Sequence, residues 1–210
     1  MRNNLFEFEN NLWNNGIRLI AGIDEVGRGS IAGPVVSAAV IFNKGEYIEG
    51  VNDSKKLTRN KREKLFEIII EKAISYGIGI VSEKEIDKMN ILNATLLSMG
   101  MAVENLGIKP EFILIDGNKM PDVSYSAKTI IKGDSKSFTI ASASIVAKVT
   151  RDKIMRDYND IYPVYLFSKN KGYATKEHIN AVKKAGLCSI HRRTFCRRIL
   201  SSEQIVFKYS

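Results

Sequence analysis

The stretch that decides the fold is residues 20–36, IAGIDEVGRGSIAGPVV. An apolar strand is followed by two adjacent carboxylates, a glycine-bracketed arginine, and a second run of small and apolar residues that begins at Pro34. A turn between two strands does not need that much charge, so we expect the acids to serve chemistry, with a metal site beside a phosphate path as the leading hypothesis. The glycines would let backbone N–H groups approach a sugar-phosphate edge.

A G-x-G pattern after a first strand also occurs in dinucleotide-binding folds, but the fit here is poor. The spacing through Gly33 is G-x-G-x-x-x-G, and Pro34 with a strand-like run follows where a helix should begin. Two carboxylates before the glycines would also repel a pyrophosphate. We therefore set the dinucleotide interpretation aside.

The rest of the chain alternates apolar runs with helical patterns. We expect strands at 17–23, 34–42 and 78–82, and two more that end at Asp116 and Asp134. The expected helices are one from Thr58 to a stop at Gly77, 83–89, 91–106, about 135–158 with a small-residue face, 174–186 with Thr175 as cap and Gly186 as stop, and a weak one at 200–208. Alternation of this kind argues for an α/β fold with a mixed sheet.

Three of the expected strands end in acid, at Asp24-Glu25, Asp116 and Asp134. Ligands of α/β sheets gather beyond the carboxyl ends of strands, so neighbouring parallel strands would bring these four side chains together. Converging carboxylates resist joint ionisation unless a cation lies among them, and ligation by oxygen alone favours Mg²⁺ or Mn²⁺ over zinc. The two histidines, His178 and His191, lie far along the chain in basic segments.

Composition narrows the class of protein. The net charge is +9 over 210 residues, which fits either a lysine-rich surface or a polyanionic partner. KNKGYATKEH and HRRTFCRR place bases near an aromatic residue, as a nucleic-acid backbone with a stacking group requires. No apolar run reaches the ~18 residues of a membrane span. The two cysteines show no metal-ligand pattern, so we expect a reduced, cytoplasmic chain without membrane association.

Six segments occur in an order that resembles a known family. They are GIDEVGRG (22–29), NDSKKLT (52–58), LIDGN (114–118), KGDSKSFTIASASIVAKVTRD (132–152), KGYATKEH (171–178) and HRRTF (191–195). Together they resemble bacterial ribonuclease HII, the type 2 ribonuclease H, over about residues 5–198. Each motif alone is moderately specific, and six in order are very specific.

The resemblance implies a ribonuclease H-like fold: a central mixed five-stranded sheet flanked by helices, in one catalytic domain spanning 1–210, with a helical C-terminal portion from about residue 160. It implies hydrolysis of RNA in RNA/DNA hybrids. It also implies incision 5′ to single ribonucleotides in duplex DNA, as in ribonucleotide excision repair. The implied chemistry uses two ions of Mg²⁺ or Mn²⁺ and leaves 3′-hydroxyl and 5′-phosphate ends.

The resemblance also assigns residues. The acidic site maps onto Asp24, Glu25, Asp116 and Asp134, and recognition of the ribose 2′-hydroxyl maps onto Gly27, Arg28 and Gly29, with Tyr173 as the junction sensor. We expect phosphate contacts from Lys55, Lys56, Lys171, Arg192 and Arg193, each of which is otherwise a solvated cation. Ser30 replaces the proline usual in the family and restores a backbone N–H. Asp152 is a rival acid that we expect to pair with Arg151 or Lys148, or to support the metal ligands without binding the ion itself.

Two other function classes stay open on the residues alone. A nucleic-acid-binding module would have no reason to end three strands in acid. A junction resolvase, another two-metal nuclease, would need no ribose sensor and would cut branched all-DNA substrates. Nothing in the sequence demands a dimer, so we expect a monomer. The end EQIVFKYS (203–210) is a faint candidate for a sliding-clamp contact that the sequence does not establish.

Overall fold

The computed structural model describes residues 5–52 and 54–204, and the side chains of Lys56 and of residues 201–204 are outside that description. Its centre is a five-stranded sheet in the order β3-β2-β1-β4-β5. β1 (Ile20–Val26) pairs antiparallel with β2 (Val35–Ile41) and parallel with β4 (Phe112–Asp116). β3 (Ser75–Val81) is antiparallel to β2, and β5 (Ala127–Ile130) is parallel to β4. The predicted mixed sheet is confirmed.

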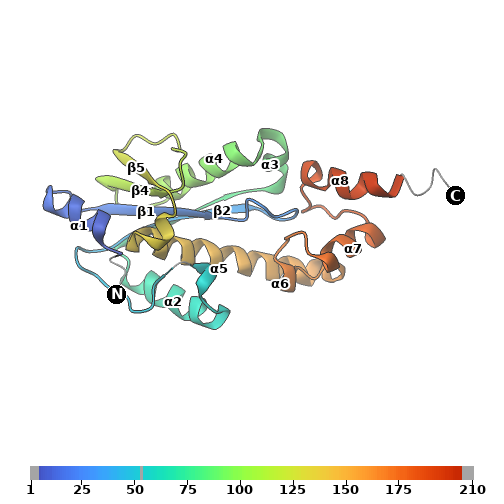
Figure 1. Ribbon diagram of the computed structural model, residues 1–210, viewed down its shortest axis with the longest axis horizontal. Coiled ribbons are helices and arrows are strands. Elements are labelled where there is room, and N and C mark those ends of the chain that lie inside the picture. The colour runs from blue at the N-terminus through green and yellow to red at the C-terminus, as the bar shows by residue number, and fades with distance from the viewer. Residues whose placement is uncertain (1–4, 53, 205–210) are drawn as a thin grey trace.

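Helices cover both faces of this sheet (Figure 1). α3 (Glu83–Met89) and α4 (Ile91–Glu104) lie on one side, and the long α5 (Phe138–Ile161) lies on the other with α2 (Arg59–Lys72) packed against it. α5 approaches β1 closely because Gly22 has no side chain: a Cβ there would lie 2.2 Å from the carbonyl carbon of Thr139. The central strands are therefore buried on both faces, which explains their nearly continuous apolar sequences.

The predicted end of one helix and the predicted start of the strand at 78–82 were both wrong near Gly77. The helix capped by Thr58 ends at Lys72, and Gly77 lies inside β3 instead of stopping the helix. The reason is packing against α4, since a Cβ on Gly77 would lie 2.1 Å from the carbonyl oxygen of Ala102. Strand β1 also begins and ends later than predicted, so Asp24 and Glu25 are part of the strand and not of the loop after it.

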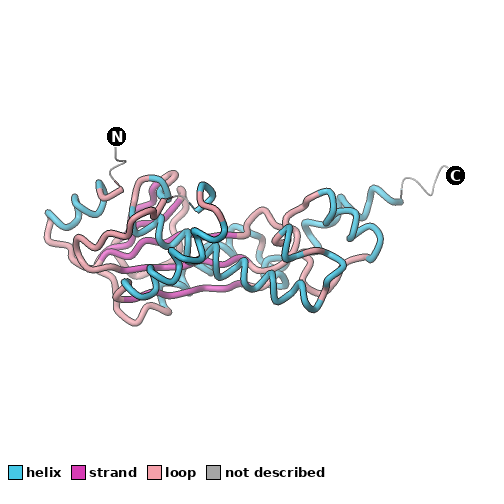
Figure 2. The backbone as a smooth tube through the Cα atoms, turned by 90° about the horizontal axis from the view of Figure 1, so that it is seen from below, coloured by secondary structure: helices cyan, strands magenta, loops and turns pink. Residues whose placement is uncertain are grey.

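The C-terminal helices lie beyond one end of the sheet, with the first of them packed against α5 and the last beginning beside α3 (Figures 1 and 2). They are α6 (Phe167–Asn170), α7 (Lys176–Ala185) and α8 (Arg193–Gln204). The Thr175 hydroxyl accepts from the His178 N–H, which confirms the predicted cap of α7. The last helix begins seven residues earlier than the predicted 200–208, and residues 205–210 lie outside the described part of the chain.

Shorter elements complete the fold. α1 (Glu7–Asn14) precedes the sheet, and short 3₁₀ turns occupy Ser54–Lys56, Gly133–Ser135 and Pro163–Tyr165. Within residues 5–52 and 54–204, no helix combines the length and the apolar character needed to cross a membrane.

Candidate active site

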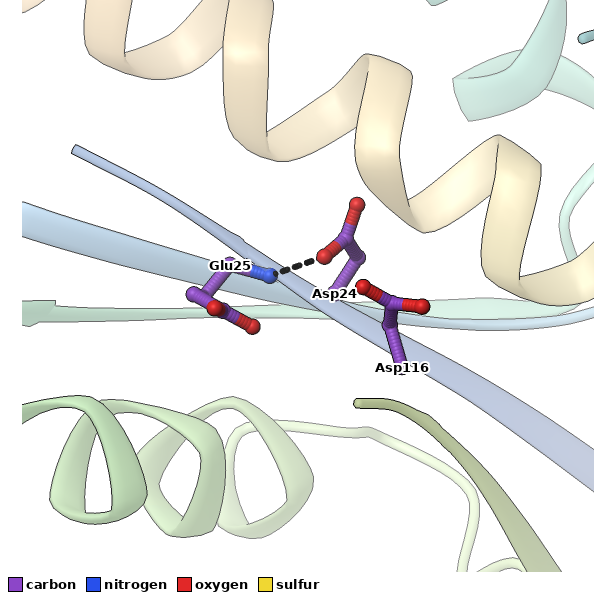
Figure 3. A group of neighbouring side chains, drawn as sticks. All are labelled: Asp24, Glu25 and Asp116. Atoms are coloured by element: carbon purple, nitrogen blue, oxygen red, sulfur yellow. Dashed lines mark hydrogen bonds between the residues drawn. The ribbon is translucent and has the colours of Figure 1, made fainter. Parts of the chain in front are cut away.

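Three carboxylates meet where β1 and β4 end side by side (Figure 3). One oxygen each from Asp24, Glu25 and Asp116 lies within 4.8 Å of the others. The cause is the parallel register, in which Ile23 of β1 is opposite Ile115 of β4, so the next residue on each strand is an acid. Asp24 and Glu25 lie on opposite sides of β1, and the Glu25 N–H donates a 2.7 Å hydrogen bond to Asp24 Oδ1.

This cluster favours bound cations. Burial raises the pKa of Asp24 well above its usual value, and the charges of Glu25 and Asp116 raise it further, against a hydrogen bond from the Ser144 side chain. Burial also raises the pKa of Glu25, although the Arg28 guanidinium opposes that shift. Carboxylates that are both buried and mutually repulsive are stabilised as anions by a hard divalent ion. The donors are all oxygen, so the residues present fit Mg²⁺ or Mn²⁺.

Asp134 is near this cluster but is not one of the three clustered acids. β5 ends at Ile130, Lys132 adopts a left-handed conformation with φ 57°, and Asp134 is placed on the following 3₁₀ turn instead of at the predicted strand end. It is buried, and its Oδ2 lies 3.8 Å from Lys55 Nζ. The preceding Gly133 N–H donates a 2.6 Å hydrogen bond to Asp116 Oδ1, which ties the turn to the cluster.

The Gly27–Arg28–Gly29 turn leaves β1 directly beside the acids. Gly27 has φ +96°, a conformation that favours glycine. Arg28 is half-exposed, and its guanidinium lies 3.0 Å from Glu25 Oε1. The N–H that Ser30 has in place of the family's proline donates a 3.4 Å hydrogen bond to the Gly27 carbonyl. The turn is therefore closed by that bond, without the proline.

Tyr173 lies on a second loop that the fold brings to the same place. The N–H groups of Ile31 and Ala32 both donate to the Gly172 carbonyl, which joins this loop to the one after Gly29. Tyr173 is 36% exposed, so its ring is not simply packed beneath α7. The Arg151 guanidinium is 5.7 Å from the centre of its ring.

The basic side chains predicted to contact phosphate differ in their exposure. Arg192 is fully buried, and its guanidinium donates to the carbonyl oxygens of Gly33 (2.9 Å) and Arg28 (3.1 Å). This placement contradicts a direct phosphate contact and makes Arg192 a support of the loop. Lys55 and Arg193 are exposed, and the Lys171 ammonium donates to the Ser168 carbonyl. The side chain of Lys56 lies outside the described residues.

Sequence reasoning missed the side chains that α5 contributes. Ser144 belongs to the small-residue face that the sequence predicts for this helix, yet its side chain is hydrogen-bonded to Asp24. Arg151 was considered only as a partner for Asp152. The predicted pairing of Asp152 is confirmed with Lys148, whose Nζ lies 2.7 Å from Asp152 Oδ1. The signal was present in the helical spacing of Ser144, Lys148 and Arg151, which places them along one side of the helix.

Comparison with known proteins agrees with this geometry. The family model described as Ribonuclease HII matches residues 21–198. Ribonuclease HII of Caldicellulosiruptor bescii is 53% identical over 198 residues, covering 94% of this chain and 96% of its own length. The crystal structure of ribonuclease H2 from Pyrococcus horikoshii OT3 has a TM-score of 0.73 at 30% identity, covering 89% of this chain and 99% of that one.

A more distant structure supports the fold alone. Bst-RNase HIII in complex with Mn²⁺ has a TM-score of 0.74 at 18% identity, over 90% of this chain and 71% of that one. The family model and the curated relative cover most of the chain, and the clustered acids supply the ligands that such an enzyme requires. The chain therefore belongs to the ribonuclease HII family and is a metal-dependent ribonuclease H, an endonuclease for RNA/DNA hybrids.

Proposed function

We propose that this ribonuclease H also incises duplex DNA on the 5′ side of a single embedded ribonucleotide, leaving 3′-hydroxyl and 5′-phosphate ends. One observation carries the proposal. The acidic cluster on β1 continues into the Gly27–Arg28–Gly29 turn, and the loop after that turn is hydrogen-bonded to Gly172, next to Tyr173. Catalytic acids and two candidate ribose contacts therefore lie on adjoining segments.

We assign Asp24, Glu25 and Asp116 as ligands of two divalent ions, Mg²⁺ or Mn²⁺, with Asp134 completing the set from its 3₁₀ turn. Bound there, such ions supply an activated water and stabilise the departing oxygen of the scissile phosphate. Asp24 is the best candidate to serve both ions, because it is the buried member of the cluster and has an oxygen within 4.8 Å of both Glu25 and Asp116. Glu25, which is also paired with Arg28, would be the more peripheral ligand.

Ribose discrimination requires a contact to the 2′-hydroxyl, which distinguishes RNA from DNA at a given position. We assign this contact to backbone groups of Gly27, Arg28 and Gly29. The exposed part of the Tyr173 ring would stack on the next sugar, where a second 2′-hydroxyl would clash. The preferred substrate is then a ribonucleotide followed by a deoxyribonucleotide.

Phosphate contacts would come from the exposed cations near the site. Lys55 and Arg193 are the candidates with exposed side chains, and Lys171 could contribute on releasing the Ser168 carbonyl. Such contacts displace counterions, so binding should weaken steeply as salt rises. We further propose that residues 1–210 act as one catalytic domain and as a monomer.

The deciding experiment uses labelled duplex DNA that contains one ribonucleotide, incubated with Mg²⁺ or with Mn²⁺. A single cut on the 5′ side of the ribonucleotide is the expected result, and the same duplex without ribonucleotide should stay intact. A junction resolvase would instead cut a branched all-DNA substrate, and a binding module would cut neither. Equal cutting of the all-DNA duplex would remove the basis for a ribose sensor.

A further inference from the structure

Arg151 lies inside α5, and its side chain is fully buried. α5 runs from beneath the sheet to the C-terminal helices (Figure 1), and the hydrogen bonds of Arg151 reach segments that are far apart in sequence. Burial lowers the pKa of Arg151, because it removes the charged guanidinium from water. Burying a guanidinium costs free energy of folding unless its N–H groups find acceptors. The acceptors that Arg151 binds therefore indicate its structural role.

Those bonds join two loops. The Nε atom donates to the Pro34 carbonyl (2.9 Å) and one terminal nitrogen donates to the Ala32 carbonyl (3.1 Å), both on the loop between β1 and β2. The other terminal nitrogen donates to the Lys171 carbonyl (2.8 Å), on the loop that carries Tyr173. The same guanidinium lies 5.7 Å from the centre of the Tyr173 ring. One rigid planar group thus contacts both loops at once.

The glycines of these loops fit around this group. A Cβ on Gly27 would lie 2.2 Å from Arg151 Nε, so the turn that carries Arg28 rests directly on the guanidinium. A Cβ on Gly172 would lie 2.4 Å from the Ala32 carbonyl oxygen, so the two loops touch each other through backbone alone. Displacing one loop relative to the other would break these close contacts.

We propose that Arg151 is a positioning residue for ribose recognition, which holds the Gly27–Arg28–Gly29 turn and Tyr173 at one fixed separation. The proposal rests on the function proposed above. An RNA/DNA hybrid offers a 2′-hydroxyl at every position of its RNA strand, so a shifted pair of loops still finds one. A single embedded ribonucleotide offers one 2′-hydroxyl and one neighbouring deoxyribose, so both loops must meet adjacent sugars together.

The test is the substitution Arg151→Lys, which keeps the charge but removes the planar fork of donors. The measured quantity is the ratio of kcat/KM on a duplex with one ribonucleotide to kcat/KM on a hybrid of the same sequence. We expect this ratio to fall by about tenfold or more, because small misplacements of positioning groups are costly. Mn²⁺ affinity, measured by calorimetric titration, should stay within about twofold of the wild type, because Arg151 makes no contact with the clustered acids.

Arg156→Lys is the matched control. Arg156 is on the same helix, but its guanidinium pairs with the Glu63 carboxylate of α2 at 3.0 Å, whereas Arg151 bonds to loop carbonyls. We expect its ratio to match that of the wild type. If Arg151→Lys does not fold, Gly172→Ala tests the same loop separation, because its Cβ would lie 2.4 Å from the Ala32 carbonyl oxygen that Arg151 also binds, at a backbone φ of +80°.

Amide hydrogen exchange separates this proposal from the proposed function. The N–H groups of Ile31 and Ala32 should exchange faster in Arg151→Lys than in the wild type or in Arg156→Lys, whichever substrate the enzyme prefers. Unchanged exchange, an unchanged ratio, or an equal loss on both substrates overturns the positioning role. A wild-type enzyme that ignores the single ribonucleotide overturns the proposed function instead.

Discussion

The Gly133 N–H donates a 2.6 Å hydrogen bond to Asp116 Oδ1. This bond joins the end of β4 to the 3₁₀ turn that carries Asp134, across 17 residues of sequence. The backbone segment that positions Asp134 therefore also orients the Asp116 carboxylate. The positions of these two acids are coupled through this one hydrogen bond.

Gly133→Ala tests this link. The new Cβ would lie 2.6 Å from Ile140 Cδ1, a flexible side-chain end, and 3.3 Å from Asp116 Oδ1. We expect a loss of about 1–2 kcal/mol in the free energy of unfolding from overpacking, and Mn²⁺ affinity lowered by about tenfold. Thermal unfolding and calorimetric titration measure the two effects.

Gly100→Ala is its control. Gly100 is inside α4, and an added Cβ there meets an ordinary contact of 3.8 Å with the Asp122 carbonyl. Alanine should stabilise the helix by about 0.5–1 kcal/mol and leave Mn²⁺ affinity unchanged. Wild-type Mn²⁺ affinity in Gly133→Ala would show that the link does not serve the metal site.

Asp24→Asn should separate stability from activity. The change removes a buried charge that Glu25 and Asp116 repel, so the protein in excess chelator should gain about 0.5–2 kcal/mol in unfolding free energy. Cleavage should fall by about a thousandfold or more while substrate binding is retained, because metal-assisted charge stabilisation is lost. Asp122→Asn, at an exposed acid, is the control. Retained turnover in Asp24→Asn would refute its metal role.

Tyr173→Ala should lose incision at a single ribonucleotide by about tenfold, with a smaller loss of substrate binding. The reason is that the ring supplies stacking area of about 1 kcal/mol or more at one sugar. Tyr173→Phe keeps the ring and should keep most of the activity. The measurements are steady-state kinetics on the duplex with one ribonucleotide and on the RNA/DNA hybrid, and substrate binding in Ca²⁺. An equal fall for both substrates would argue against a junction sensor.

The buried histidine pair predicts an acid limit to stability. His178 Nε2 and His191 Nε2 lie 3.0 Å apart, and His191 Nδ1 accepts from the Cys188 N–H at 3.0 Å. Burial and then the charge of His178 lower the pKa of His191 to about 4. The unfolded chain therefore binds more protons than the folded one between about pH 6.5 and 4, and stability should fall by about 2 kcal/mol as pH drops through that range.

Denaturant unfolding at several pH values measures this slope. His191→Asn removes the titrating group, so its stability should depend less steeply on pH between about 6.5 and 4, even if the variant is less stable throughout. Parallel slopes for the variant and the wild type would contradict the neutral, buried state of His191.

Local patterns in the chain were enough for much of the site. Asp24 and Asp116 each follow an apolar run, so their place at or near the carboxyl ends of strands follows from residue order. The caps of α2 and α7 at Thr58 and Thr175 were also correct, because a cap depends on neighbours within one turn. Gly77 was misassigned for the opposite reason, because its role depends on packing against Ala102 of α4, which is more than 20 residues away.

The sequence by itself determined which chemical groups are available: carboxylate ligands near the ends of strands, a glycine-containing turn, and basic side chains that suit a polyanionic partner. Tertiary structure decided which of them meet. It clusters Asp24 and Glu25 with Asp116, and it buries Arg151 and Arg192 against carbonyls 117 and 159 residues away. The physical reason is that charge belongs to a residue, whereas burial and hydrogen-bond partners belong to the packing of distant segments.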